Sequence, residues 1–223
     1  IHLDLFPYIY TYAQIASQTG IPLMRAMALS FPKDPKIWNP LLEFQYMFGS
    51  ELLVAPVYFG HTNNWQVYLP AGRWCNFWSG DPVQGGRDLI VKVDLGEIPV
   101  FVKAGAIIPM LDGNPDTLLD SDSPKIRVAK QDLCLQIYNG ANGNFKLYDG
   151  SQFNWLDHDQ SLIIQDVPTP RWISIKKMAS KGIFSLAIGP DGQSISLFEG
   201  NLTGNLDFVR LWVETPGQYK VIM

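Results

Sequence analysis

Nucleophilic catalysis by serine or cysteine needs an adjacent base, usually histidine, and the chain has three histidines, His2, His61 and His158. None of them shares a strand–turn–helix context with a nucleophile. The sequence also contains no HExxH pair, no CxxC pair, no EF-hand loop and no P-loop. It therefore gives no support to a hydrolase triad, a metal site or a nucleotide site.

Paired carboxyl groups are a second source of chemistry, because glycosidases work with two of them. The two groups lie roughly 5–5.5 Å apart in retaining enzymes and about 6.5–9.5 Å apart in inverting ones. Spacing along this sequence singles out no pair, and turn or cap formation is the default role of each acid. The candidates are Asp34, Glu43, Glu51, Asp81, Asp88, Asp94, Glu97, Asp149, Asp157 and Asp159.

Aromatic residues make up 13% of the chain, and a sugar ligand is one use for them. Their faces stack on pyranose rings, while carboxylates and amides bind hydroxyl groups. For any single tryptophan, however, packing in a core is favoured, because a large ring contributes much buried area at low entropy cost. The tryptophans concerned are Trp65, Trp74, Trp78, Trp155 and Trp172.

Charge and hydropathy exclude several classes of partner. Charged residues reach 17%, the formal net charge is −4, and no basic block occurs, which argues against nucleic acid or an anionic membrane surface. No apolar run approaches the roughly 18 residues that span a bilayer. The chain starts at Ile1 within an apolar pattern and shows no targeting segment, so we expect a fragment of a longer protein whose compartment stays open. Cys75 and Cys134 match no metal spacing, which predicts two free, buried thiols.

The elements that must position these residues change character along the chain. Helical spacing predicts a helix over residues 1–19, capped at Gly20. Pro22–Phe31 is then expected to be a strand buried on both faces, as in a parallel sheet. Pro40 opens a predicted second short helix, LLEFQYMF, which ends at Gly49, before Leu52–Val57 extends again. A helix followed at once by a buried strand is typical of α/β folds.

Beyond Gly60 the pattern is that of an all-β protein. Apolar and polar residues alternate, and turn formers recur every eight to twelve residues. The acidic, turn-rich stretch Leu111–Pro124 predicts a boundary between two β modules. Predicted strands are Leu89–Val93, Ile98–Val102, Ala106–Pro109, Leu133–Tyr138, Phe145–Tyr148, Ser161–Ile164, Trp172–Lys176, Phe184–Ile188 and Ser194–Phe198.

Four segments, read in order, resemble glycoside hydrolase family 31. They are LFPYIYTYAQIASQTGIPLMRAMALSFPKD, FQYMFGSELLVAPV, VYLPAGRWCNFWSG and IPVFVKAGAIIPM, within residues 3–110. Leu133–Asn154 is similar to the β domain that ends many members. That match is looser, because only Asp149 stands before Gly150 where the family often has an acidic pair. Ser30 likewise stands where many relatives have a glutamate before the Phe-Pro.

The resemblance implies a mainly β chain: the C-terminal end of a (β/α)8 barrel followed by two β-sandwich domains. Residues 1–48 would hold the last helix and strand of the barrel with a short helix. Residues 49–113 would form the proximal sandwich, and residues 125–223 the distal β domain. In this alignment PLMRAM resembles the eighth barrel strand.

The family's catalytic residues are two aspartates, after barrel strands four and six, and both would lie upstream of Ile1. The resemblance thus assigns no catalytic residue, no metal ligand and no cofactor to this chain, and it leaves substrate-binding residues open. Trp155–Gln160 imitates the nucleophile motif, but it has Gln where the family has Glu and lies among sandwich hairpins. Since catalytic groups of barrel enzymes follow barrel strands, we expect Asp157 to cap a loop.

Two further polar residues near the inferred barrel are of interest, Arg25 and Asp34. An unpaired buried arginine is strongly destabilising, so we expect Arg25 to form a structural ion pair in preference to a substrate contact. In FQYMFGSELLVAPV, Gln45 and Glu51 are expected to satisfy backbone groups.

The implied function is that of the C-terminal portion of a retaining α-glycosidase, of the α-glucosidase type, acting on terminal α-linked glucosyl residues. Its partner would be an α-linked oligosaccharide or glucoside, bound by a barrel outside this chain, with oligomeric state open. One alternative is a non-catalytic carbohydrate-binding or structural β module. Within the family, α-xylosidase, glucosyltransferase, sulfoquinovosidase and α-glucan lyase activities also remain open.

Overall fold

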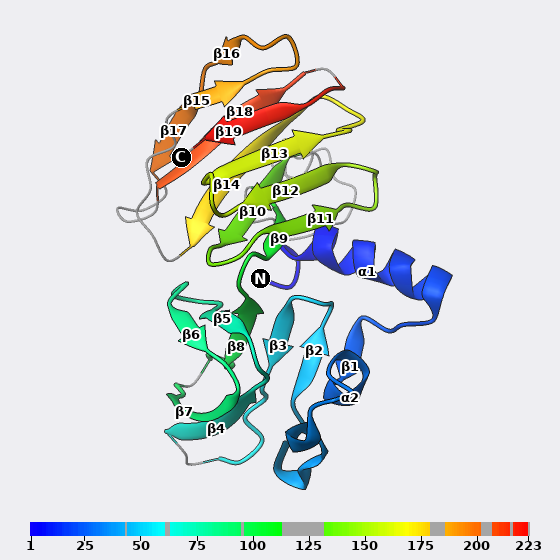
Figure 1. Ribbon diagram of the computed structural model, residues 1–223, viewed down its shortest axis with the longest axis vertical. Coiled ribbons are helices and arrows are strands. Elements are labelled where there is room, and N and C mark those ends of the chain that lie inside the picture. Colours follow the sequence, from blue (N-terminus) through cyan, green and yellow to red (C-terminus); the bar gives the residue numbers. More distant parts are fainter. Residues whose placement is uncertain are drawn as a thin grey trace. The chain divides into compact units, whose positions relative to one another are not determined.

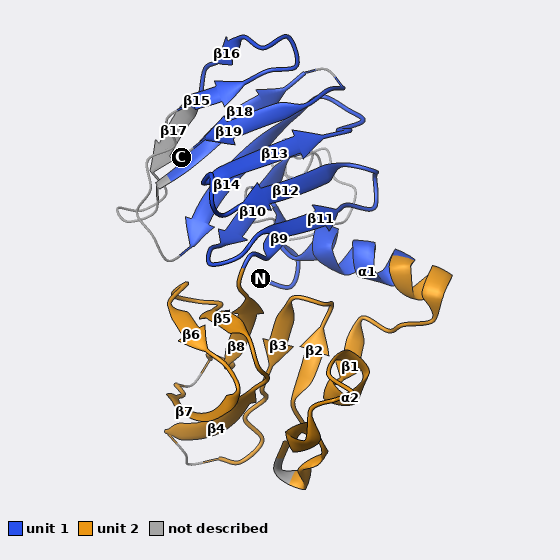
Figure 2. Cartoon of the chain, in the orientation of Figure 1, with its two compact units in different colours: residues 1–14, 105–223 blue, residues 15–104 orange. Residues whose placement is uncertain are grey.

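The computed structural model describes residues 1–42, 44–60, 63–94, 96–112, 132–178, 186–201, 207–214 and 216–222. Two compact units form, shown in Figure 2: unit 2 comprises residues 15–104, and unit 1 combines residues 1–14 with 105–223. Each unit is built mainly of β-strands, as Figure 1 shows. No helix in the described ranges is long and apolar enough to cross a membrane.

Unit 2 contains a six-stranded sheet and a separate strand pair, both antiparallel in every pairing described. The sheet has the order β1 (Met24–Ala26), β2 (Tyr46–Phe48), β3 (Leu52–Val54), β8 (Val100–Lys103), β5 (Arg73–Asn76) and β6 (Pro82–Gln84). The pair consists of β4 (Asn64–Leu69) and β7 (Arg87–Lys92). Short helical turns follow β1: α2 (Met27–Ser30), η1 (Pro35–Trp38) and η2 (Pro40–Leu42).

The core of unit 2 lies where strand alternation directs apolar side chains to one side. Met47, Leu53 and Phe101 are Cα partners across β2, β3 and β8, and all three are buried. They cluster with Val67 of β4 and with Trp74. Burying each such side chain contributes about 1.5–3 kcal/mol, so this cluster fixes the register of the three strands.

Unit 1 holds two larger sheets. The five-stranded sheet has the order β17 (Phe198–Asn201), β18 (Asp207–Val213), β14 (Arg171–Met178), β10 (Leu133–Tyr138) and β9 (Ile107–Leu111), and its β10–β14 pairing is parallel. The six-stranded sheet has the order β11 (Gly143–Lys146), β12 (Gln152–Leu156), β13 (Ser161–Gln165), β19 (Tyr219–Ile222), β15 (Leu186–Ile188) and β16 (Ser194–Ile195). Alternate residues are buried along β10, β12 and β19, which is the pattern of sandwich strands.

Helix α1 (Phe6–Thr19) begins five residues later than the helix predicted over residues 1–19. Its first half packs in unit 1: the Tyr8 ring stacks on Phe145 with centroids 5.8 Å apart, and the Thr11 hydroxyl accepts a hydrogen bond from Tyr148 N at 3.2 Å. At its end the predicted cap is confirmed, since Gly20 has φ +74° and donates to Ala16 O at 2.8 Å.

Two local predictions were wrong. Pro22–Phe31 is not one buried parallel strand: β1 covers three residues, pairs antiparallel with β2, exposes Met24, and is followed at once by α2. The physical reason is its position at the edge of the sheet. Of the helix predicted to open at Pro40 over LLEFQYMF, the described residues form only the short turn η2, because pairing of Tyr46–Phe48 with two neighbouring strands overrides the helical preference of the end of that sequence.

The remaining predicted strands overlap β-strands of the structure. Leu133–Tyr138 coincides with β10, and the other predicted strands overlap observed strands with shifted ends. Part of Phe184–Ile188 and most of Leu111–Pro124 lie outside the described residues. The prediction of a mainly β chain is confirmed.

Candidate functional site

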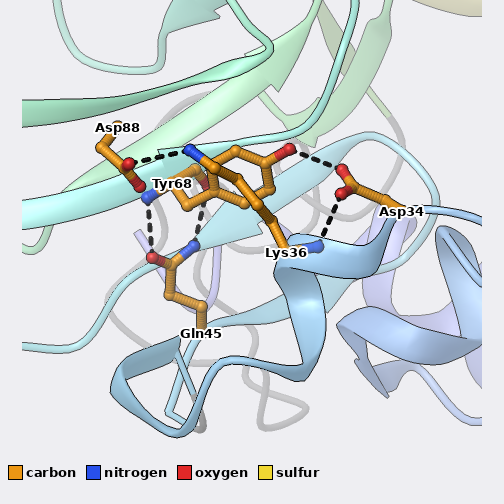
Figure 3. A network of polar contacts seen from close by, with 5 residues as sticks. All are labelled: Asp34, Lys36, Gln45, Tyr68 and Asp88. Carbon is orange, nitrogen blue, oxygen red and sulfur yellow. Dashed lines mark hydrogen bonds and ion pairs between the residues drawn. The ribbon is translucent and has the colours of Figure 1, made fainter.

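A network of polar contacts surrounds Tyr68 in unit 2, as Figure 3 shows. Asp34 precedes η1, and its carboxylate accepts hydrogen bonds from Lys36 N at 3.0 Å and from the Tyr68 hydroxyl at 2.6 Å. The Lys36 ammonium lies 2.9 Å from an Asp88 carboxylate oxygen and 4.9 Å from the centre of the Tyr68 ring. One carboxylate therefore caps a turn and also ties that turn to strand β4.

Gln45 completes the network by binding the backbone of Tyr68 on the edge of β4 that does not pair with β7. Its side-chain oxygen accepts from Tyr68 N and its amide nitrogen donates to Tyr68 O, both at 2.9 Å. The primary amide thus acts as one residue of a further strand along the free edge of β4. This confirms the prediction that Gln45 satisfies backbone groups, and all the polar atoms concerned are buried.

The electrostatics of the network hold its phenol neutral. Burial, which is the largest cause, acts together with the hydrogen bond to Asp34 and the negative charges of Asp34 and Asp88 to raise the pKa of Tyr68 to about 12. A protonated phenol at neutral pH donates a hydrogen bond and cannot serve as a base. The arrangement is suited to holding Asp34 and Gln45, and the turns between them, on strand β4.

Arg25 lies on the buried side of β1. Its Nε donates to Pro22 O at 2.8 Å, and its Nη1 donates to Ser50 Oγ at 3.0 Å. Glu51 accepts from Ser50 N at 3.2 Å, as predicted for its role toward the backbone. Burial lowers the pKa of Lys103 in the same region, where Glu51 acts to raise it and Arg25 to lower it. Arg25 is thus anchored by structural hydrogen bonds, and its ion pair stays a prediction.

Asp157 caps a loop, as expected. It follows β12, and its Oδ1 accepts from Gly140 N at 2.9 Å and from Trp155 Nε1 at 3.2 Å. Its own N–H donates to Asn142 Oδ1 at 2.9 Å. With both bonds directed at one carboxylate oxygen, Asp157 joins two turns of unit 1.

The predicted tryptophans divide between core and surface. Trp74 and Trp155 are buried, Trp65 and Trp172 are partly buried, and Trp78 is exposed. Neither cysteine forms a disulfide. Cys75 is buried and Cys134 is partly buried, and burial, followed by the charges of Asp112 and Asp4, raises the pKa of Cys134 to about 12.

Among the candidate acids, only Asp34 and Asp88 meet in the network, where Lys36 lies between them. Glu43 and His61 lie outside the described residues. Within the described part of the chain no three His, Cys, Asp or Glu side chains gather to hold a metal ion. Sequence reasoning missed the contacts of Tyr68, Lys36 and Asp88, because Asp34 and Tyr68 are 34 positions apart and nothing in the sequence between them signals their pairing.

The chain is similar to known proteins in both sequence and fold. Residues 20–108 match the glycosyl hydrolase family 31 C-terminal domain. An isomaltosyltransferase of Sporosarcina globispora is 48% identical over 108 residues, 48% of this chain and 10% of that protein. An α-xylosidase of Saccharolobus solfataricus is 36% identical over 150 residues, 67% of this chain and 19% of that protein.

Among solved structures, a family 31 dextranase of Flavobacterium johnsoniae, complexed with isomaltotriose, superposes with a TM-score of 0.79 and 25% identity. That alignment covers 99% of this chain and 31% of the dextranase chain. By fold the chain is one of the mainly β portions found in multidomain glycosidases. It belongs to glycoside hydrolase family 31, and it spans only 10% and 19% of the two curated relatives.

Proposed function

We propose that this chain is the C-terminal portion of a retaining α-glycosidase of the α-glucosidase type, and that both catalytic aspartates lie in polypeptide before Ile1. The observation that carries the proposal is the match of residues 20–108 to the family's C-terminal domain. The activities of its relatives, an isomaltosyltransferase, an α-xylosidase and a dextranase, support an α-linked saccharide as substrate.

The proposed reaction is a double displacement. One aspartate attacks the anomeric carbon and forms a glycosyl-enzyme, while the other protonates the leaving oxygen and then activates water for hydrolysis. The substrate is the non-reducing end of an α-linked gluco-configured glycoside. Neither a metal nor a cofactor enters this scheme.

In this scheme residues 1–48 supply the last helix and strand of the barrel, residues 49–113 the proximal sandwich, and residues 125–223 the distal β domain. Strand β1 is then part of the eighth barrel strand, so the segment that follows β1 comes directly after that strand. Residues after barrel strands form the catalytic face of such enzymes. The hydrogen bonds of Asp34 and Gln45 to Tyr68 therefore give that segment a fixed anchor on the sandwich.

The test uses the whole encoded protein with p-nitrophenyl α-glucoside, p-nitrophenyl α-xyloside and isomaltotriose. We expect nitrophenol release from the α-glucoside, with α-glucose as the first product seen by proton NMR. Early appearance of β-glucose would overturn the retaining mechanism. Faster release from the α-xyloside would replace the α-glucosidase assignment by an α-xylosidase, and predominant formation of longer oligosaccharides would replace it by a transferase.

A further inference from the structure

The outer face of the five-stranded sheet in unit 1 carries two tryptophans side by side. Trp172 of β14 and Trp212 of β18 are Cα partners, and their ring centroids lie 5.3 Å apart at an interplanar angle of 58°. Along β18 Val209, Leu211 and Val213 are buried, so Trp212 lies on the opposite face, where its side chain is 38% exposed. A large aromatic ring is thus offered to solvent on a regular strand.

A charged group fixes these rings in place. Arg210 lies two residues before Trp212 on the same face, and its guanidinium carbon is 5.0 Å from the centre of the Trp172 ring. The backbone N–H of Trp172 donates to Asp132 Oδ1 at 3.1 Å. The Trp172 ring therefore packs against a cation and its partner ring, while its backbone is fixed by a carboxylate, and this packing reduces the side-chain entropy lost on binding.

Hydrogen-bonding groups border the aromatic surface. Arg210 Nη2 lies 2.7 Å from an Asp132 oxygen and 3.4 Å from an Asp112 oxygen, and Asp112 also accepts from the Ser174 hydroxyl at 2.6 Å. Arg210 Nε is buried without a hydrogen-bond partner in the part of the chain that the structure describes. The side chains of Arg210 and Asp112 are 32% and 18% exposed, so a donor and an acceptor for hydroxyl groups lie beside the rings, whereas Asp132 and Ser174 are buried.

The balance of charge selects the kind of ligand. Asp112 and Asp132 face Arg210, and Lys176 lies on the same face of β14 and acts with Asp112 on the neighbouring Cys134, so cations and carboxylates are balanced and the surface favours neither anions nor cations. A neutral ring with apolar C–H faces and several hydroxyl groups satisfies both parts of the surface. A pyranose ring has this chemistry.

We propose that the Trp212 surface, made of Asp112, Asp132, Trp172, Arg210 and Trp212, is a non-catalytic binding site for a gluco-configured α-glucan. The Trp212 ring stacks on one sugar ring, Asp112 and Arg210 bind its hydroxyl groups, and the buried Asp132 holds Arg210 and the backbone of Trp172 in place. The choice of an α-glucan rests on the proposed function, whereas the existence of the site rests on the geometry alone. It retains the substrate polymer near the enzyme without chemistry.

The test is calorimetric titration of the 223-residue chain with isomaltotriose and, separately, with maltotriose. We expect weak, saturable binding that falls by about tenfold in Trp212→Ala, the size of loss typical of a key aromatic contact. Trp78→Ala, which removes an exposed tryptophan of unit 2, is the matched control and should bind like the wild type. Trp212→Phe keeps an aromatic face and should bind with intermediate affinity.

Several results would overturn the site. They are no binding of either sugar by the wild type, equal affinity in wild type and Trp212→Phe, or equal losses in the Trp212 and Trp78 variants. Thermal melting of each variant shows whether it folds. Sedimentation in which Trp212→Ala converts a dimer to a monomer would also overturn the proposal, in favour of a protein interface. Each of these outcomes leaves the hydrolase assay of the whole protein unaffected.

Discussion

At the scale of single residues, the Gln45 side chain makes the backbone hydrogen bonds that a neighbouring strand would otherwise make. Its amide satisfies both backbone groups of Tyr68, and each buried polar group left without a partner costs about 1–3 kcal/mol. We therefore expect Gln45→Ala to lower the free energy of unfolding by about 2 kcal/mol or more. Urea denaturation of the wild type and the variant, followed by circular dichroism, measures this difference in the free energy of unfolding. Gln66→Ala, which removes an exposed glutamine of the same strand, is the control, and a loss no larger than in that control would contradict this role.

The raised pKa of Tyr68 predicts a dependence on alkaline pH. Because the folded-state pKa of about 12 exceeds the unfolded value near 10, the phenol contributes stability that is complete below pH 10 and is lost as pH rises toward 12. Tyr68→Phe lacks this contribution. The stability difference between wild type and variant should therefore narrow between pH 10 and pH 12, and a constant difference across that range would refute the assignment.

Some of these roles were readable from the sequence and others were not. The polar residues of FQYMFGSELLVAPV stand at fixed places among apolar ones, which predicted backbone contacts for Gln45 and Glu51. The loop role of Asp157 followed from its hairpin context. By contrast, the pairing of Arg210 with Asp112 and Asp132 joins residues distant in sequence, and only the sheet order brings them together.

At the scale of elements, turn residues and alternation predicted where most strands lie. They failed at Pro22–Phe31 and LLEFQYMF, because helix and strand compete closely in short apolar runs and the pairing of β1, β2 and β3 decides between them. Family resemblance identified those segments, but it did not describe their local structure.

A close approach of two backbone segments gives a prediction at this scale. A Cβ atom added at Gly143, the first residue of β11, would lie 1.7 Å from Gly105 O, just before β9. Gly143→Ala must therefore displace backbone, and we expect a loss of about 3 kcal/mol or more in the free energy of unfolding. Gly60→Ala is the control, since nothing lies within 4 Å of its added Cβ. Equal melting temperatures of the two variants would show that the backbone yields without cost.

At the scale of the whole molecule, we propose that the residues that identify the family and the residues that catalyse the reaction lie in different parts of the protein. The family is identified by residues that form a sandwich core and a buried polar network, such as Trp74 and Gln45. None of the described carboxylates forms the acid pair of a glycosidase in our proposal. In that proposal the chain supplies two β units, and the Trp212 surface supplies a contact to the polymer.

The most direct test is an assay of the purified 223-residue chain with p-nitrophenyl α-glucoside and isomaltotriose, beside its Asp157→Ala variant. The account predicts no release of nitrophenol or glucose above buffer by either protein, together with a lower melting temperature in the variant because Gly140 and Trp155 lose their acceptor. Turnover by the wild-type chain that Asp157→Ala abolishes would contradict it, because a catalytic residue would then lie within these residues.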